Sequence, residues 1–251
     1  MTDDVALVFL PSVLYRSGQL FDIERLTRAA HERGLLIGFD CCHSAGAVPH
    51  RFDDWDVDFA VWCGYKYLNA GPGSTAFLYV NRRHFDRQPH LVGWFGSDKA
   101  RQFDMTHDFV PAAEAGRWQI SSPSILSAVP LEASLRLFQE AGLGRLRAKS
   151  LALTSYLIDL VDAELAAPPY LFRVGTPRDP ARRGGHVAIE RDERAWEICE
   201  ALKARGVVGD FRPPNVIRLA PAAFFNTFYE VWRTAAALKE IIDRGEHLAA
   251  P

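Results

Sequence analysis

The sequence has few cysteines. Its 251 residues include only four, and none of them belongs to a CxxC pair. Their spacing does not match a zinc site either, so we expect neither a disulfide framework nor a bound metal. Three of the four lie in or beside apolar, strand-like runs, which indicates buried thiols in the reducing cytoplasm. The four are Cys41, Cys42, Cys63 and Cys199.

The chain also lacks an excess of charge and a long apolar run. Its 29 lysine and arginine residues are balanced by 31 aspartate and glutamate residues, so the composition does not indicate a nucleic-acid or membrane partner. No apolar run reaches transmembrane length, and no signal peptide precedes the first charged residues. We expect a soluble, cytoplasmic protein.

Several catalytic motifs are missing as well. The sequence contains no HExxH, no GxSxG, no Walker loop and no GxGxxG after a strand. These absences disfavour a zinc protease, a serine hydrolase of the nucleophile-elbow type, a P-loop enzyme and a dinucleotide-binding enzyme. Any catalytic residues of this chain therefore belong to a pattern other than these four motifs.

Polar side chains follow two apolar runs between Leu35 and Gly73. Asp40 ends the run LLIGFD, and His43 comes three residues later. Lys66 follows the second run, VDFAVWC, and precedes a Gly-Pro-Gly loop. Because open α/β sheets bind their ligands outside the carboxyl ends of strands, Asp40 and Lys66 are expected to hold the two ends of one flat cofactor.

Pyridoxal phosphate (PLP) requires these two groups, a Schiff-base lysine at its aldehyde and a carboxylate at its ring nitrogen. The carboxylate keeps the ring nitrogen protonated, and the lysine carries the cofactor and later moves protons. The sequence therefore predicts PLP as the cofactor. In the alternative interpretation, Asp40 is a strand-end cap and Lys66 is a solvated loop lysine.

The distribution of apolar residues predicts an α/β fold with a mainly parallel sheet. Asp22 is expected to cap a helix that Gly34 ends, and Pro168-Pro169 should end a long second helix. The predicted strands of the first half lie at residues 5–10, 35–40, 57–63 and 75–80. The predicted elements of the second half are helices at 125–143, 145–165, 195–206 and 229–244 and strands at 186–190 and 216–220.

Five segments together resemble kynureninase: FDCCHSAGAVPH, WDVDFAVWCGYKYLNAGPGS, LVGWFG, WQISSPSIL and NVIRLAP. The resemblance extends from about Val5 to near Ile242. It implies a fold-type I, aminotransferase class V-like PLP enzyme that hydrolyses L-kynurenine, or its 3-hydroxy form, to the anthranilate and L-alanine. It also implies a homodimer with a shared active site. The implied domains are part of the PLP-binding domain, residues 1–127, and a small α/β domain with the connecting long helix, residues 128–251.

The resemblance assigns a role to each candidate residue near the cofactor ring. Lys66 corresponds to the Schiff-base lysine and Asp40 to the partner of the ring nitrogen. His43 corresponds to a histidine near the ring, or to a supporting histidine behind it. Tyr65 corresponds to the tyrosine that contacts the phosphate and relays protons, although it could also serve packing alone.

Three further residues are assigned in the same way. Trp94 and Ser122, with Ser121 as a near competitor, correspond to residues that reach the partner's cofactor phosphate. Arg218 corresponds to the arginine that holds the substrate α-carboxylate. An arginine between two apolar neighbours would be costly to bury without an anionic partner, which supports that assignment.

The resemblance also implies that the family has a substantial length of chain before Val5, with the phosphate-binding loop and an aromatic that stacks on the ring. We therefore expect the 251 residues alone to bind PLP weakly and to show negligible kynurenine hydrolysis. Two other hypotheses remain open. One is a cysteine desulfurase or selenocysteine lyase, although Cys63-Gly64-Tyr65-Lys66 stands where those enzymes typically have Ser-x-His-Lys. The other is a cofactor-free remnant that still dimerises.

Overall fold

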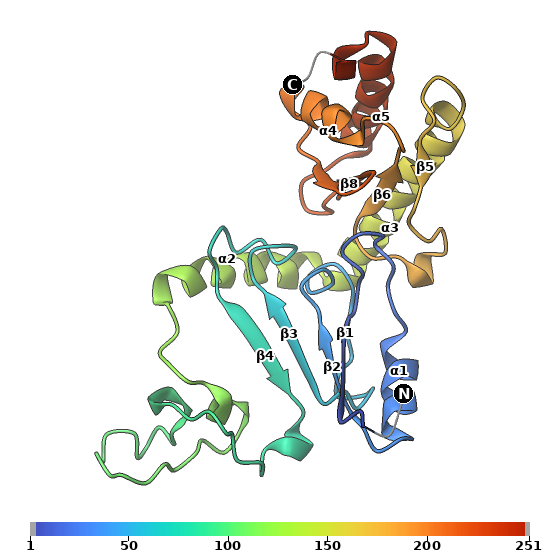
Figure 1. The fold of residues 1–251 in the computed structure, drawn as a ribbon. Coiled ribbons are helices and arrows are strands. Elements are labelled where there is room, and N and C mark those ends of the chain that lie inside the picture. The colour runs from blue at the N-terminus through green and yellow to red at the C-terminus, as the bar shows by residue number, and fades with distance from the viewer. Residues whose placement is uncertain (1–3, 249–251) are drawn as a thin grey trace. The chain divides into compact units, whose positions relative to one another are not determined.

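The computed structural model describes residues 4–248 (Figure 1). These residues form two compact units, the first made of residues 4–12, 22–45 and 50–137, and the second of residues 13–21, 46–49 and 138–248. The limit between the units lies inside helix α2 (Ile125–Ala141). The domain limit expected after residue 127 falls in the same helix and stays a prediction.

The first unit contains a sheet of four strands in the order β1-β2-β3-β4 (Figure 1). β1, β2 and β3 are parallel, and β4 is antiparallel to β3. The four predicted strands and the mainly parallel sheet are thus confirmed. The strands are β1 (Leu7–Pro11), β2 (Leu36–Asp40), β3 (Phe59–Cys63) and β4 (Ala76–Val80).

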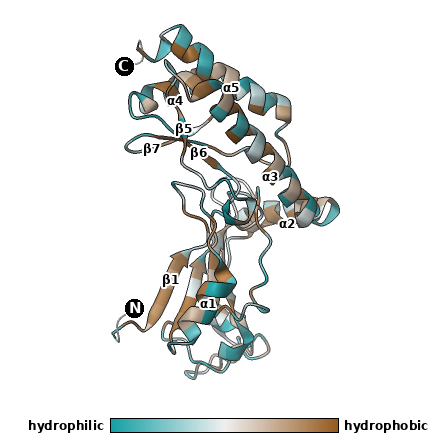
Figure 2. Cartoon of the chain, turned by 90° about the vertical axis from the view of Figure 1, so that its right-hand side faces the viewer, coloured by the Kyte–Doolittle hydropathy of each residue, from teal (hydrophilic) through white to brown (hydrophobic). Residues whose placement is uncertain are grey.

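Helix α1 (Ile23–His31) packs its apolar face into the core of this unit. Asp22 caps it as expected, with Oδ1 accepting the N–H of Arg25 at 3.0 Å. Gly34 follows the helix with a φ of +69°, a conformation that glycine adopts without strain. Figure 2 shows the difference in pattern, since β1 is continuously apolar whereas α1 alternates between polar and apolar residues.

A buried carboxylate joins several elements at the amino end of β3. The side chain of Asp58 is 2 % exposed, and its Oδ2 accepts hydrogen bonds from the Ile37 N–H at 2.7 Å and from His31 Nε2 at 3.0 Å. Its Oδ1 lies 2.6 Å from His84 Nε2 and also pairs with Arg83. Through this one carboxylate, α1, β2, β3 and the short helix η1 (Arg82–His84) are connected.

The segment between β4 and α2 has little regular structure. It contains the short helices η2 (Trp94–Gly96) and η3 (Ala115–Trp118). Two of its loops pass very close to each other, because a Cβ at Gly93 would lie 1.9 Å from the carbonyl oxygen of Ile120. Position 93 therefore requires a glycine. Through Gly93, the chain just before Trp94 lies against the backbone of Ile120.

The second unit has an antiparallel sheet in the order β5-β6-β8-β7. The predicted strands at 186–190 and 216–220 are confirmed as β6 and β8, whereas the short edge strands β5 and β7 were not predicted. Three helices pack on an apolar core of this unit. The elements are α3 (Leu143–Leu160), which continues into a π-helical turn η4 (Val161–Leu165), β5 (Arg173–Val174), η5 (Pro180–Arg182), β6 (Val187–Glu190), α4 (Ala195–Ala204), β7 (Asp210–Arg212), β8 (Val216–Leu219), α5 (Phe228–Asp243) and η6 (Glu246–Leu248).

Among residues 4–248, no helix has the length and apolar character that crossing a membrane would require.

Candidate active site

The carboxyl ends of β2 and β3 bring the central candidate residues to one edge of the sheet. Asp40 is the last residue of β2, and Lys66 comes three residues after the end of β3. The two strands are neighbours and parallel, with Asp40 opposite Val61. The main chain therefore delivers a carboxylate and an amine to the same edge, as the sequence pattern predicts.

Asp40 is held in place by its own backbone and by the turn that follows it. Its carbonyl oxygen accepts hydrogen bonds from the backbone N–H of Ser12 at 2.9 Å and from the Ser12 hydroxyl at 3.1 Å. Its Oδ1 accepts the N–H of Cys42 at 2.8 Å. One oxygen of a half-buried carboxylate is thus engaged by the turn, which orients the other for a ligand.

A row of side chains supports this turn from behind, and the sequence pattern did not reveal it. Ser44 Oγ lies 2.6 Å from Ser12 Oγ and 2.7 Å from His50 Nε2. Burial lowers the pKa of His50 to about 4, so its ring is neutral at neutral pH. His43 lies in the same turn and is half-buried. The ring-contacting role that the resemblance gives to His43 stays a prediction.

The loop that carries Lys66 is closed by backbone hydrogen bonds. The N–H of Asn69 donates to the Lys66 carbonyl at 3.0 Å, and the N–H of Ala70 donates to the Gly64 carbonyl at 3.0 Å. Asn69 has a φ of +55°, which asparagine tolerates better than most residues. Lys66 itself is half-buried, with Nζ 5.6 Å from the centre of the Tyr65 ring.

Tyr65 is connected to Asp40 through two thiols. The neighbouring Cys63, through its charge first and through hydrogen bonding second, raises the pKa of the Tyr65 phenol. The Cys42 thiol donates to Asp40 and lies within hydrogen-bonding range of Cys63. Burial first, and Asp40 second, raise the pKa of Cys42 to about 12. At neutral pH the Cys42 thiol and the Tyr65 phenol are therefore protonated beside the Asp40 carboxylate.

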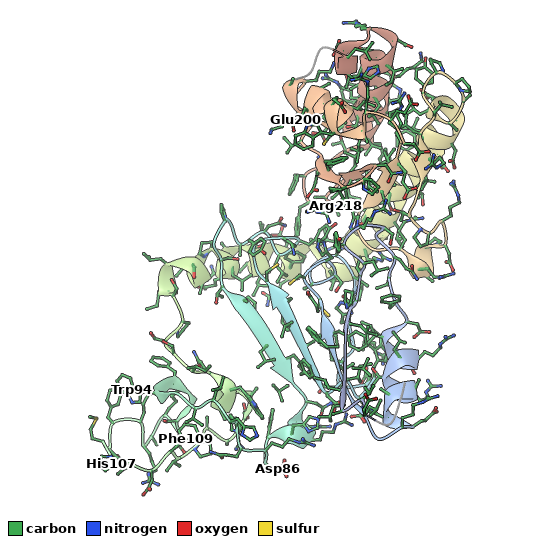
Figure 3. The ribbon with its side chains drawn as sticks, viewed as in Figure 1. Asp86, Trp94, His107, Phe109, Glu200 and Arg218 are labelled. Carbon is green, nitrogen blue, oxygen red and sulfur yellow. The ribbon has the colours of Figure 1, made fainter. Side chains whose placement is uncertain are left out.

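Trp94 and Ser122 lie elsewhere in the first unit. Trp94 begins η2, beyond the end of the sheet opposite Lys66 (Figure 3). Its indole Nε1–H donates to the carbonyl oxygen of Gln102 at 2.8 Å. Ser121 and Ser122 are both exposed. The structure does not bring these residues to Asp40 and Lys66 of the same chain, and their role toward a partner's site stays a prediction.

Arg218 lies on β8 of the second unit (Figure 3), and one supporting argument for its role requires correction. Its side chain is only 12 % exposed, but it already has an anionic partner, since Nη2 donates to Asp210 Oδ2 at 2.7 Å. Nη1 donates to the Tyr15 carbonyl at 2.6 Å. Because Asp210 is the residue opposite Arg218 in the β7–β8 ladder, burial of this arginine does not by itself require a substrate carboxylate. The unpredicted strand β7 is what supplies the partner.

The residues at the edge of β2 and β3 fit PLP. By chemical type, the Lys66 amine suits the aldehyde of PLP, the Asp40 carboxylate suits its ring nitrogen, and the Tyr65 phenol suits one of its polar substituents. The buried hydroxyl of Ser74 has no hydrogen-bond partner among residues 4–248. It lies against Gly64, where an added Cβ would be 2.6 Å from Ser74 Oγ. An unused donor therefore lies against Gly64, two residues before Lys66, and position 64 has no room for a larger residue.

Comparison with known proteins identifies the family of the chain. The aminotransferase class-V family model matches residues 1–190. The chain belongs to the aminotransferase class-V family. The kynureninase C-terminal domain model matches residues 146–238. The predicted resemblance, fold class and PLP cofactor are thereby confirmed.

Close relatives within this class-V family are kynureninases. The kynureninase of Bacillus thuringiensis subsp. konkukian (strain 97-27) is 56% identical over 247 residues, which cover 98% of this chain and 57% of the relative. The kynureninase of Geobacillus thermodenitrificans (strain NG80-2) is 54% identical over the same shares of the two chains. The chain thus spans little more than half the length of these relatives.

Solved class-V structures share the fold at much lower identity. The apo cysteine desulfurase from Thermococcus onnurineus NA1 superposes with a TM-score of 0.80 at 21% identity, covering 94% of this chain and 60% of that one. The cystine C-S lyase C-DES, in complex with its reaction product cysteine persulfide, gives a TM-score of 0.81 at 19% identity, covering 95% and 62%. These matches support the architecture alone.

Asp40→Asn is expected to lower turnover by roughly 100-fold, in the range seen when a preorganised charge or donor is removed from an active site. The amide keeps an oxygen for the Cys42 N–H, so folding should change little. Asp53→Asn serves as a control, because Asp53 accepts a hydrogen bond from Tyr79 and has no predicted catalytic role. Parent-rate turnover by Asp40→Asn, measured by steady-state kinetics, would refute the role at the ring nitrogen.

Proposed function

We propose that the protein to which this chain belongs is a kynureninase, which hydrolyses L-kynurenine or its 3-hydroxy form to the anthranilate and L-alanine. The observation that carries the proposal is 54–56% identity to named kynureninases across nearly all of the chain. The juxtaposition of Asp40 and Lys66 at the ends of β2 and β3 supports it. The reaction is a hydrolytic cleavage of the carbon–carbon bond next to the side-chain ketone.

PLP, when bound, supplies an aldehyde for exchange with the substrate amine and a ring that accepts electrons from the substrate. Lys66 would hold the cofactor aldehyde and, once displaced, take the proton from the substrate α-carbon at its Nζ. Asp40 would keep the ring nitrogen protonated. Tyr65, whose pKa is raised, stays protonated at neutral pH and can donate its phenol proton.

Arg218 would bind the substrate α-carboxylate in this proposal. Its guanidinium is oriented by Asp210 and by the Tyr15 carbonyl, and a planar fork suits a carboxylate. Water then adds to the side-chain ketone, and alanine leaves after the anthranilate. Contacts around the aryl ring, which would choose between kynurenine and its 3-hydroxy form, are not assigned to residues of this chain.

A cysteine desulfurase activity is the main competitor, because the solved relatives include desulfurases of the same fold. That chemistry needs a reactive cysteine on a loop. Cys199 instead lies in α4, where burial raises its pKa to about 11. A thiol of this kind is a poor nucleophile at neutral pH, which supports kynurenine hydrolysis over desulfuration.

The decisive experiment offers the protein PLP with either L-kynurenine or L-cysteine. Anthranilate is followed by its fluorescence and alanine by amino-acid analysis, while sulfide is measured in the cysteine reaction. Equal release of anthranilate and alanine, without sulfide, is the expected result. Sulfide release from cysteine in the absence of kynurenine hydrolysis would contradict the proposal.

Arg218→Lys is expected to raise the KM for kynurenine by roughly 10- to 100-fold, which corresponds to about 1.5–3 kcal/mol for a lost charge-assisted hydrogen bond. A lysine cannot reproduce the bidentate fork. Arg212→Lys is a matched control, since Arg212 shares the Asp210 carboxylate from the neighbouring strand. An unchanged KM in Arg218→Lys, or an equal rise in both variants, would place the carboxylate site elsewhere.

We also propose a cytoplasmic homodimer. All four cysteines are free thiols, which supports a reducing compartment. Exposed apolar side chains are concentrated between β4 and the middle of α2, which supports association through this segment. These side chains include Leu91, Trp94, Phe103, Met105, Ile120, Ile125, Leu126 and Val129.

A further inference from the structure

Cys42 lies in the turn that follows β2, and Cys63 is the last residue of the neighbouring strand β3. The register pairs Asp40 with Val61, and it continues beyond the end of β2 because the Cys41 N–H donates to the Val61 carbonyl at 2.7 Å. At the same offset, Cys42 comes opposite Cys63. The two strands that lead to these residues lie about 4.7–4.9 Å apart, a spacing within the roughly 4.4–6.8 Å between Cα atoms that a disulfide needs.

The two cysteines of the turn have different surroundings. Cys41 directly follows the last residue of β2, and Cys42 belongs to the turn that begins there. Cys41 is fully buried and hydrogen-bonds with Ser12 and Ser44. The Cys42 thiol lies within hydrogen-bonding range of Cys63. Cys42 therefore has Cys63 as its neighbouring thiol, whereas Cys41 interacts with two serine hydroxyls.

We propose that Cys42 and Cys63 form a reversible disulfide in the wall of the active site. With a peroxide as oxidant, the sulfur of one cysteine attacks a peroxide oxygen, the O–O bond breaks, and a sulfenic acid forms as water leaves. The second thiol then displaces water from that sulfur and closes the S–S bond. In sum, two thiols and hydrogen peroxide give one disulfide and two waters, and a dithiol reductant returns both protons and both electrons.

Exposure decides the order of the two steps. Cys42 is half-buried whereas Cys63 is buried, so a peroxide reaches Cys42 first and Cys63 resolves the sulfenic acid. Asp40, Cys63 and Tyr65 are the titratable groups that act on these thiols. The high pKa of Cys42 keeps the thiolate scarce at neutral pH, so oxidation should require excess peroxide and should proceed faster as the pH rises.

The disulfide would join Cys42, which lies two residues after Asp40, to Cys63, which lies three residues before Lys66. It would also remove the thiol proton that Cys42 donates to Asp40. This consequence rests on the proposed PLP site. If that site is correct, the oxidised chain should bind less PLP at Lys66 than the reduced chain does.

The test treats the 251-residue chain with hydrogen peroxide, alkylates the remaining thiols without reduction, and maps the peptides by mass spectrometry. The expected product is a linked pair of peptides containing Cys42 and Cys63, lighter by two hydrogen masses and separated by dithiothreitol. Cys42→Ser should abolish the linked pair and leave Cys63 alkylated. Cys199→Ser, which removes a buried thiol of the second unit, should leave the linked pair unchanged.

Two other results would overturn the disulfide: a link from Cys42 to Cys41, or Cys42 accumulating as sulfinic acid while Cys63 stays alkylated. Because this readout needs no PLP, it stands apart from the proposed function. Borohydride trapping of PLP on Lys66, compared between the oxidised and reduced forms of the protein to which this chain belongs, tests the coupling separately. Equal trapping in the two forms would overturn the coupling, and trapping in neither form would count against the PLP site instead.

Discussion

Lys66→Ala is expected to abolish covalent capture of PLP by the protein to which this chain belongs. When PLP is added and the adduct is reduced with borohydride, the pyridoxyl group should be found on Lys66 of the parent chain and on no lysine of the variant. The reason is the position of Lys66, half-buried in a closed loop directly after β3 and at the same sheet edge as Asp40. Turnover should fall by at least roughly 100- to 10,000-fold, the contribution usual for a positioned acid–base group.

The remaining lysines provide the controls. Lys99 lies in the same unit, is exposed, and donates to the Phe95 carbonyl, so Lys99→Ala should leave both labelling and turnover unchanged. Peptide mapping separates Lys66 from all other sites. Predominant labelling at Lys149, Lys203 or Lys239 in the parent chain would refute the assignment, since those residues lie on the helices of the second unit.

Sequence patterns were most informative where one local feature determines the outcome. The four apolar runs of the first half became strands because each is short and largely apolar. Helix α1 begins after Asp22, whose carboxylate caps it, and ends before Gly34, which adopts a positive φ. The placement of Asp40 and Lys66 at one edge follows from the parallel pairing of two such strands. These inferences needed only neighbours in sequence and one rule of topology.

Features that depend on distant partners were not accessible in the same way. Strand β7 is three residues long, and only its pairing with β8 makes it a strand and brings Asp210 to Arg218. The proximity of Cys42 and Cys63 likewise depends on the β2–β3 register, which cannot be predicted from the segments DCCH and WCGYK alone. Asp58 is one of several acidic residues in RFDDWDVD, and its burial depends on donors contributed by α1, β2 and η1.

Asp58→Ala is expected to destabilise the first unit by about 3–5 kcal/mol, the usual cost of removing one partner from a buried ion pair. The substitution leaves the Ile37 N–H and the rings of His31 and His84 without their acceptor. The free energy of unfolding is measured by chemical denaturation. Hydrogen exchange of peptides from β2 and β3 shows that the loss belongs to this unit.

The Asp58 carboxylate should also make stability depend on pH. Burial opposes its ionisation, but hydrogen bonds from His31, the Ile37 N–H, His84 and Arg83 outweigh burial and lower its pKa to about 2, from an ordinary value of 3.8. A pKa lowered by folding stabilises the folded state above the unfolded value, and this contribution disappears as the pH falls through the folded value. The parent should therefore lose about 2–3 kcal/mol between roughly pH 5 and pH 1 through this group.

A neighbouring aspartate tests whether burial is the cause. Asp54 is exposed and pairs with Arg51 on the surface at 2.6 Å, so Asp54→Ala should change stability by less than about 1 kcal/mol. The difference in unfolding free energy between the parent and Asp58→Ala should be largest near neutral pH and should shrink as the pH falls from about 4 toward 2. A difference that stays constant over that range would mean that Asp58 stabilises the unit by packing and not as an ionised acceptor.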